Sequence, residues 1–156
     1  NNVLESFDYF IKLKNIKVDI DCPEYLKTPS MIEPEVYSIV INLISNAIKV
    51  IIDTGEKNIK IEASKTDSEF RFSVKDTGIG LNEKYWERVF EPLVSDPEEK
   101  IYTNPNILYS SILGTGTGIG LSIVKEIVNK YGGSVEFRTP SKGYKTEIEV
   151  VIPWQK

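Results

Sequence analysis

The sequence predicts an α/β fold, a two-layer α+β sandwich in which a mixed sheet of about five strands carries helices on one face. Two observations predict it. Alternating apolar and polar residues, typical of half-buried strands, occur over 16–22, 58–65, 69–75, 134–139 and 144–152. Helical periodicity covers 33–53 and 118–131, where mostly apolar helices need a sheet to cover.

The remaining segments are shorter or irregular. Residues 3–14 place apolar side chains at helical spacing and predict one helix. Polar residues 66–68 predict a hairpin between two strands, and residues 83–90 predict a short helix. Residues 91–117 contain three prolines and predict a long irregular connection.

Composition limits the possible functions. The 156 residues suffice for one domain, and their net charge of −4 argues against nucleic acid as a partner. The apolar runs are far shorter than the ~20 residues of a membrane span, so we expect no membrane contact by this domain. The chain has no histidine, which excludes a catalytic imidazole and a phosphohistidine of its own. Its single cysteine excludes an intramolecular disulfide and is compatible with the cytoplasm.

The predicted helix 33–53 carries a narrow polar wedge. At ~100° per residue, Asn42, Asn46, Lys49 and Asp53 fall within roughly 60° of one another. Nearly every other position from 36 to 52 is apolar, so the helix should be buried on most sides. Amides and an ammonium on such a helix need partners. The wedge therefore either lines a polar pocket or forms a solvent-facing stripe.

A first glycine motif, DTGIG at 76–80, follows a predicted strand. The Asp76 carboxylate could accept a hydrogen bond from an exocyclic amine such as that of adenine, and the glycines would let the backbone approach a flat ring. A ligand-free turn is the alternative. An aspartic protease is excluded, because it needs two such aspartates and a largely β architecture.

A second motif, GTGTGIG at 114–120, leads into the predicted helix 118–131. Unpaired N–H groups at a helix start, together with the helix dipole, favour phosphate. A flexible linker is the alternative. The sequence contains no GxxxxGK[ST] motif, which excludes a P-loop, and no GxGxxG spacing, which argues against a dinucleotide fold.

Four segments together resemble the ATP-binding domain of the GHKL superfamily, which includes DNA gyrase, ninety-kilodalton heat-shock chaperones, histidine kinases and mismatch-repair ATPases. The resemblance runs from about residue 16 to Pro153, and within the superfamily this segment is most similar to the histidine kinases. It rests on the N box at 42–49 (NLISNAIK), the G1 box at 76–81 (DTGIGL), the F box at 90–93 (FEPL) and the G2 box at 116–121 (GTGIGL).

The resemblance implies a GHKL-type fold with a mobile lid at about 91–117, and ATP and Mg²⁺ as ligands. Asn46 would bind the metal, whereas Asn42 and Lys49 would act beside the phosphates in catalysis. The residues implied in nucleotide binding are Asn46, Asp76, Gly78, Gly80, Phe90, Gly116, Thr117, Gly118, Gly120 and Leu121. Phe90 could equally be a plain core aromatic.

The residue at position 42 separates activities within the superfamily. Hydrolytic members carry a glutamate there as general base, and an asparagine cannot take that proton. The resemblance therefore implies a protein histidine kinase that transfers the γ-phosphoryl group of ATP to a histidine on a dimeric helical hairpin. We expect residues 1–15 to end the linker from that hairpin and 16–156 to form the catalytic domain. We expect a response regulator as an indirect partner, and a cytoplasmic domain whose parent protein can be membrane-anchored.

The F box departs from the FEPFFTTK form of one kinase subgroup, because residues 90–97 read FEPLVSDP and lack its lysine. Lys84, Arg88 or Lys100 could compensate. The departure keeps two alternatives open: a degenerate nucleotide-binding or docking module without transfer, and an anti-sigma-type serine kinase.

Overall fold

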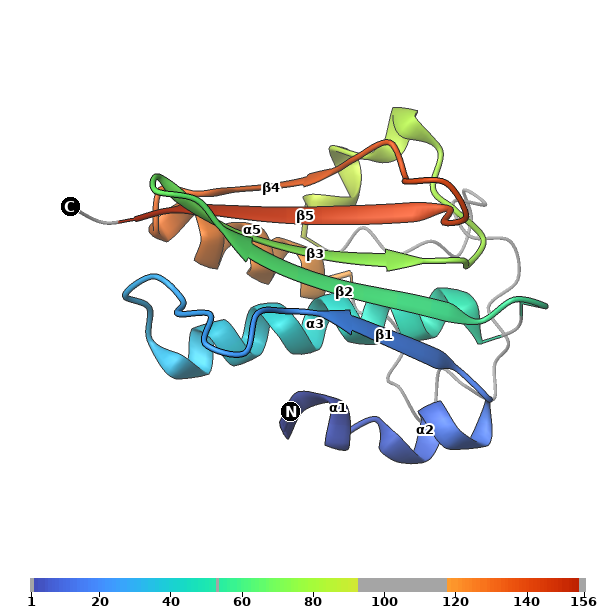
Figure 1. Cartoon of the computed structure of the whole chain (residues 1–156). Helices are drawn as coiled ribbons and strands as arrows, with labels where there is room; N and C mark the ends of the chain where they lie inside the picture. The colour runs from blue at the N-terminus through green and yellow to red at the C-terminus, as the bar shows by residue number, and fades with distance from the viewer. Residues whose placement is uncertain (1, 53, 93–117, 155–156) are drawn as a thin grey trace.

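The computed structural model describes residues 2–52, 54–92 and 118–154 (Figure 1). Gly116, Thr117, Asp53 and all but the first two residues of the expected lid lie outside these ranges. The described chain forms a sheet with two long helices against it, and the prediction of a mixed five-stranded, two-layer α/β fold is confirmed.

The sheet has the strand order β1-β2-β3-β5-β4 (Figure 1). Only β1 and β2 run parallel, and the three other pairs are antiparallel. The strands are β1 (Lys17–Asp21), β2 (Asn58–Lys65), β3 (Glu69–Asp76), β4 (Ser134–Phe137) and β5 (Thr146–Pro153). The order places the end of β3 beside the start of β5, where Asp76 pairs with Thr146.

Alternation in the sequence decides which face of each strand is buried. Along β2, Ile59, Ile61 and Ala63 are buried, whereas the intervening side chains are half-exposed. The same alternation in β5 buries Ile148, Val150 and Ile152. Successive strand residues point to opposite faces, so the apolar set forms one continuous inner face.

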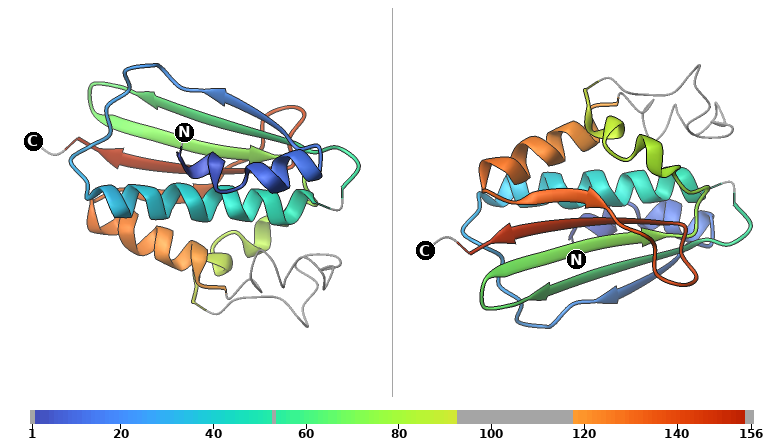
Figure 2. Two further views of the ribbon diagram at one scale, coloured as in Figure 1. Left: turned by 90° about the horizontal axis from the view of Figure 1, so that it is seen from below. Right: turned by 90° about the horizontal axis from the view of Figure 1, so that it is seen from above.

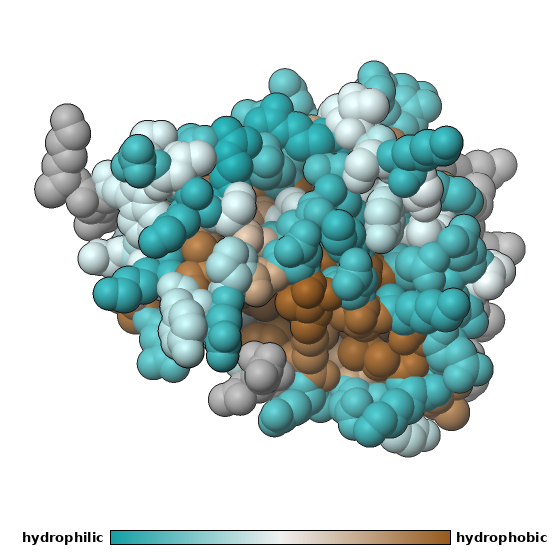
Figure 3. Space-filling view, viewed as in Figure 1, coloured by the Kyte–Doolittle hydropathy of each residue, from teal (hydrophilic) through white to brown (hydrophobic). Residues whose placement is uncertain are grey.

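Two helices cover that inner face, α3 (Glu33–Ile51) and α5 (Gly120–Lys130), and both lie on the same side of the sheet (Figure 2). The buried residues of α3 are Ile39, Leu43, Ile44, Ala47, Ile48 and Ile51. The outer face of the sheet is mainly polar, and apolar side chains gather below it, toward β1 and the N-terminal helices (Figure 3). The core therefore lies between one sheet face and two helices.

The predicted single helix over 3–14 is wrong. The chain forms α1 (Asn2–Glu5) and α2 (Asp8–Leu13), with a turn at Ser6 and Phe7. Phe7 has φ −108° and ψ 0°, and its side chain is buried in the core. Burial of this ring outweighs the weak preference of a short segment for continuous helix.

The predicted helix over 83–90 is also replaced, by two 3₁₀ turns, η1 (Glu83–Tyr85) and η2 (Arg88–Phe90). The Asn82 side chain accepts a hydrogen bond from the backbone N–H of Lys84 and caps the first turn. The Tyr85 N–H donates to the Asn82 carbonyl three residues back, at 2.9 Å. Such i→i+3 bonds close tighter turns than an α-helix does.

Candidate functional site

The polar strip of α3, defined by Asn42, Asn46 and Lys49, is half-buried. The residues between its members, including Leu43 and Ala47, are buried. Within the described residues, the side chains of Asn46 and Lys49 make no hydrogen bond or ion pair. Burial lowers the pKa of Lys49, because a desolvated ammonium loses its hydration. The strip is therefore not a solvent stripe of freely hydrated charges.

Asn42 meets the start of α5. Its amide Nδ2 donates to the Ser38 carbonyl at 2.8 Å, one turn earlier on α3. Its Oδ1 lies beside Gly120, where a Cβ on that residue would stand 2.7 Å from it. A side chain at position 120 would thus collide with the amide, so glycine allows the second glycine motif to approach the strip. Gly118, with φ +65°, lies two residues before this contact.

Asp76 ends β3 and is 3% exposed. Its Oδ1 accepts a hydrogen bond from the Gly78 N–H at 2.8 Å, and its carboxylate also accepts one from the Thr146 hydroxyl. Burial raises the pKa of Asp76 to about 6, although these two bonds and the charge of Lys145 act in the opposite direction. The site therefore holds a carboxylate at a fixed position, although burial makes its ionised form energetically unfavourable.

The first glycine motif contacts the other end of the strip. A Cβ on Gly78 would lie 2.8 Å from both the Cγ2 and the carbonyl oxygen of Val50, the residue after Lys49. It would also lie 2.7 Å from Asp76 Oδ1. Only a glycine permits this approach, so α3 has one glycine motif against Val50 and the other against Asn42.

Two threonines fix this arrangement, and sequence reasoning missed both. The Thr77 hydroxyl accepts from the Asn58 N–H at 3.0 Å and donates to the Glu56 carbonyl at 2.8 Å. Thr146 faces Asp76 across the β3–β5 pair. A threonine at the start of a predicted strand gives no sign of its partner until the strand order is known.

Phe90 and Leu121 belong to the hydrophobic core. The Phe90 ring centroid lies 5.5 Å from that of Phe137 on β4, and the Lys125 ammonium lies 5.6 Å from the Phe90 ring. The alternative of a core aromatic therefore describes the observed packing of Phe90.

The structure describes only some of the basic residues that could replace the missing F-box lysine. The Lys84 ammonium lies 4.6 Å from the Tyr85 ring centroid, and Lys100 is outside the described residues. Lys125, which sequence reasoning did not consider, brings a cation to Phe90, the first residue of the F box.

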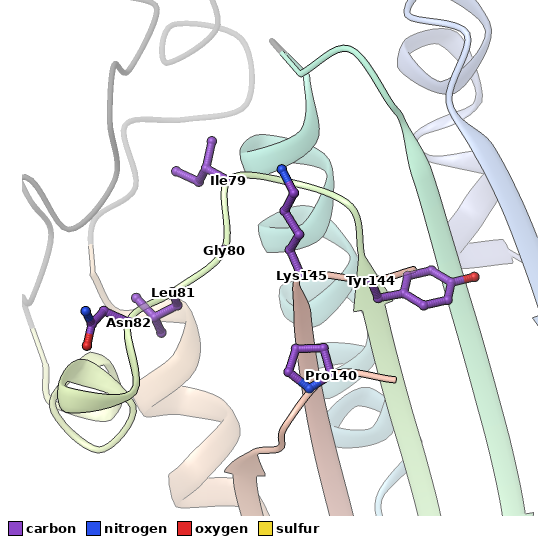
Figure 4. A pocket seen from close by; sticks show the side chains of 7 residues that line it. All are labelled: Ile79, Gly80, Leu81, Asn82, Pro140, Tyr144 and Lys145. Carbon is purple, nitrogen blue, oxygen red and sulfur yellow. The ribbon is translucent and has the colours of Figure 1, made fainter. Parts of the chain in front are cut away.

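An open cavity of about 540 Å³ lies beside the segment after β3. Residues 79–82 form one side, and Pro140, Tyr144 and Lys145 form the other (Figure 4). Of the predicted site residues that the structure describes, only Gly80 lines it. The cavity is thus next to the first glycine motif, on a side that the α3 strip does not line.

Comparison with known proteins gives the family. Residues 31–156 match the protein family described as "Histidine kinase-, DNA gyrase B-, and HSP90-like ATPase". The chain belongs to this ATPase family.

Two relatives of this ATPase domain are sensor kinases. The sensor histidine kinase WalK of Bacillus subtilis (strain 168) is 31% identical over 124 residues, which are 80% of this chain and 18% of WalK. The adaptive-response sensory kinase SasA of Prochlorococcus marinus (strain MIT 9215) is 29% identical over 133 residues, which are 85% of this chain and 32% of SasA. The chain thus spans about a third or less of these relatives.

Solved structures carry the same fold. The catalytic domain of histidine kinase ThkA, in a nucleotide-free form, matches with a TM-score of 0.76 and 25% identity, over 97% of this chain and 89% of that one. Full-length ShkA in complex with AMPPNP matches with a TM-score of 0.74 and 25% identity, over 99% of this chain and 29% of that one. The chain therefore corresponds to the catalytic domain of histidine kinases.

Helix α3 of the ATPase domain is long and apolar enough to cross a membrane by length and composition, with a mean hydropathy of 1.2. Its buried face packs against the sheet and α5, and its polar strip lies between the glycine motifs. The apolar composition of α3 is therefore explained by its place in the core of the domain.

Proposed function

We propose that this chain binds Mg²⁺ and ATP as the catalytic domain of a sensor histidine kinase, and that the γ-phosphoryl group goes to a histidine on a helical hairpin outside residues 1–156. The observation that carries the proposal is the juxtaposition on α3: a half-buried amide-and-lysine strip with Gly120 against one end and Gly78 near the other. Membership of the ATPase family supports ATP as the ligand.

Asp76 is the proposed acceptor for the adenine amine, with Gly78 and Gly80 giving the ring access to the backbone. A buried carboxylate is costly unless it has donors. The Gly78 N–H occupies Oδ1 at 2.8 Å, and the carboxylate retains lone pairs for a further donor. An exocyclic amine would supply that donor, whereas the carbonyl of guanine would be repelled.

The polar strip is the proposed phosphate and metal side. Lys49 is desolvated and lacks an ion-pair partner among the described residues, so an anionic phosphate would restore its electrostatic balance. Gly118 and Gly120 at the start of α5, with Gly116 and Thr117 before them, would offer N–H groups to the same phosphates. Leu121 and Phe90 would support this side from the core.

Asn46 fits a role in holding Mg²⁺. Its amide is half-buried and has no hydrogen-bond partner among the described residues. The described residues also contain no cluster of three Asp, Glu, His or Cys, so protein oxygens for a cation would come from amides. Mg²⁺ accepts few protein ligands together with phosphate oxygens, and when bound it would neutralise phosphate charge.

Asn42 favours transfer to a protein over hydrolysis. An amide cannot remove a proton from water, so the chain positions ATP and leaves the nucleophile to its partner. The chain contains no histidine, which requires an acceptor from another segment. We further propose a cytoplasmic site of action and a response regulator as the final phosphate acceptor.

Two measurements test the proposal. Calorimetric titration of ATP with Mg²⁺ should show binding to the wild type and at least a 100-fold loss in Asp76→Asn, because a buried site rejects a ligand whose hydrogen bond it can no longer form. Asp67→Asn, in the exposed β2–β3 hairpin, is the matched control.

The second measurement is phosphate transfer from radiolabelled ATP in the full-length protein. Acid-labile, base-stable label is expected. Binding without transfer would instead favour a degenerate docking module, and acid-stable phosphoserine on a partner would favour the anti-sigma-type kinase. Unchanged ATP affinity in Asp76→Asn would refute the assignment of the site.

A further inference from the structure

We propose that Trp86 is a positioning residue for the nucleotide base, because its indole holds the end of the loop that follows Asp76. The inference rests on the proposed function, in which the loop 77–82 borders the base. The Trp86 indole N–H donates to the Leu81 carbonyl at 3.2 Å, five residues back along the chain.

The start of this loop is held firmly and its middle is not. Thr77 is fixed to the backbone of residues 56 and 58 by its hydroxyl, and the Gly78 N–H is bound to Asp76. Within the described part of the chain, Ile79 and Gly80 make no hydrogen bond. The indole bond at Leu81 is therefore the next anchor after Gly78, and it sets where Gly80 lies.

The indole is itself fixed by aromatic packing. Its ring stacks on Phe137 of β4, with centroids 6.1 Å apart and an interplanar angle of 24°. Phe137 in turn contacts Phe90, whose ring lies under the Lys125 ammonium of α5. This chain of contacts joins the loop on the base side to the helix on the proposed phosphate side. The position of the Leu81 backbone thus depends, through Trp86, on the positions of the sheet and of α5.

The sequence could not separate this role from ordinary core packing. A tryptophan in a predicted short helix reads as a buried aromatic, and Trp86 is in fact half-buried against the core. The deciding observation is the direction of its N–H, which points to the loop carbonyl and not to its own turn. An indole donor that meets a partner is worth more than its apolar area alone.

The test separates the N–H group from the ring. Trp86→Phe keeps an aromatic ring for Phe137 but removes the donor, and Trp86→Leu removes both. In full-length kinase we expect Trp86→Phe to raise KM for ATP roughly three- to tenfold, the size of one lost hydrogen bond, with kcat within about twofold of wild type. Trp86→Leu should raise KM further.

The chain offers a matched control. The Trp154 indole N–H also donates to a backbone carbonyl, that of Thr66 at 2.8 Å, in the hairpin at the far end of β2 and β3. Trp154→Phe therefore loses the same kind of bond without touching the loop, and its KM should equal that of wild type. Thermal unfolding of each variant separates lost stability from lost affinity.

The outcomes are distinct. A raised KM in Trp86→Phe alone supports the inference. An unchanged KM, or an equal rise in Trp86→Phe and Trp154→Phe, overturns it, as does a fall in kcat with no change in KM. Wild-type protein that fails to bind ATP would overturn the proposed function first and would be seen before any variant is compared.

Discussion

Among the residues that the structure describes, Asp76 is the one acidic side chain that is buried. Its folded pKa, about 6, lies above the ordinary value of 3.8, so the native state resists its ionisation. Asp76 therefore contributes most to stability below pH 3.8, and that contribution is lost as pH rises through about 6. At neutral pH the carboxylate that would recognise a base weakens the fold.

Asp76→Asn should consequently raise stability while it removes ATP binding. An asparagine keeps an oxygen for the Gly78 N–H and carries no charge to desolvate. We expect the free energy of unfolding at pH 8 to increase by about 1–3 kcal/mol, and the gain to vanish near pH 4. Urea unfolding at both pH values measures it. A variant less stable than wild type at pH 8 would contradict this account.

Spacing predicted that Asn42, Asn46 and Lys49 lie on one side of a helix, and α3 places them so by helical geometry alone. Asp53, the fourth residue of the predicted wedge, lies outside the described residues. Their individual roles stay predictions. Thr146 escaped prediction for a physical reason: its partner, Asp76, lies 70 positions away in the numbering and meets it only through the β3–β5 register. Residues that act across strands cannot be paired before the strand order is known.

At the level of elements, the N-terminus of α3 is joined to the C-terminus of α5. The Tyr131 hydroxyl donates to Glu35 Oε2 at 2.5 Å and accepts from the Ile32 N–H at 3.1 Å. The Lys130 ammonium bonds Glu35 Oε1 at 2.7 Å. These bonds lie in the first turn of α3, away from Asn46 and Lys49 in its second half, so they hold the two helices in register.

Tyr131→Phe should loosen this junction. It removes the hydroxyl that joins the Ile32 N–H to Glu35, and we expect a small loss in the free energy of unfolding, because water can replace the lost partner of these accessible groups. ATP affinity should remain within about twofold of wild type, because the junction lies at the other end of α3. Urea unfolding and calorimetric ATP titration measure the two effects. Tyr25→Phe, at a side chain 85% exposed, is the control and should change neither.

Long elements were predicted better than short ones. The alternation over 58–65 gave the bounds of β2, whereas the periodicity over 3–14 failed at Phe7. An eight-residue alternation constrains every side chain to one face or the other. Helices of one or two turns depend on tertiary contacts, such as burial of Phe7, that no local pattern contains.

For the whole molecule, the sequence predicted a mixed sheet with helices on one face but not the strand order. The β2–β3 hairpin follows from a short polar turn, but the pairing of β5 with β3 joins strands that are distant in the sequence. Ion pairs on the outer face of the sheet help to stabilise this strand order. There the Lys75 ammonium pairs with Glu62 and lies 3.6 Å from Glu147 on the neighbouring strand. Opposite charges thus bridge three adjacent strands.

Glu62 makes this face sensitive to acid. Hydrogen bonds from Lys60 and then Lys75 lower the pKa of its carboxyl below the ordinary value, against the effect of burial. A lowered folded pKa gives stability that is present above the unfolded pKa and is lost as pH falls through the folded one. Glu62 and Asp76 therefore respond to acid with opposite signs.

Glu62→Gln should lower the free energy of unfolding by about 1 kcal/mol at pH 7, a value limited by the partial exposure of the pair. The difference from wild type should begin to shrink as pH falls below the ordinary glutamate pKa of 4.5, and it should be lost as pH falls through the lower pKa of the folded state. Urea unfolding across pH 3–8 follows it, with Glu126→Gln on the exposed side of α5 as the control. A difference that stayed constant over this range would mean that packing of the side chain, and not its charge, holds the outer face together.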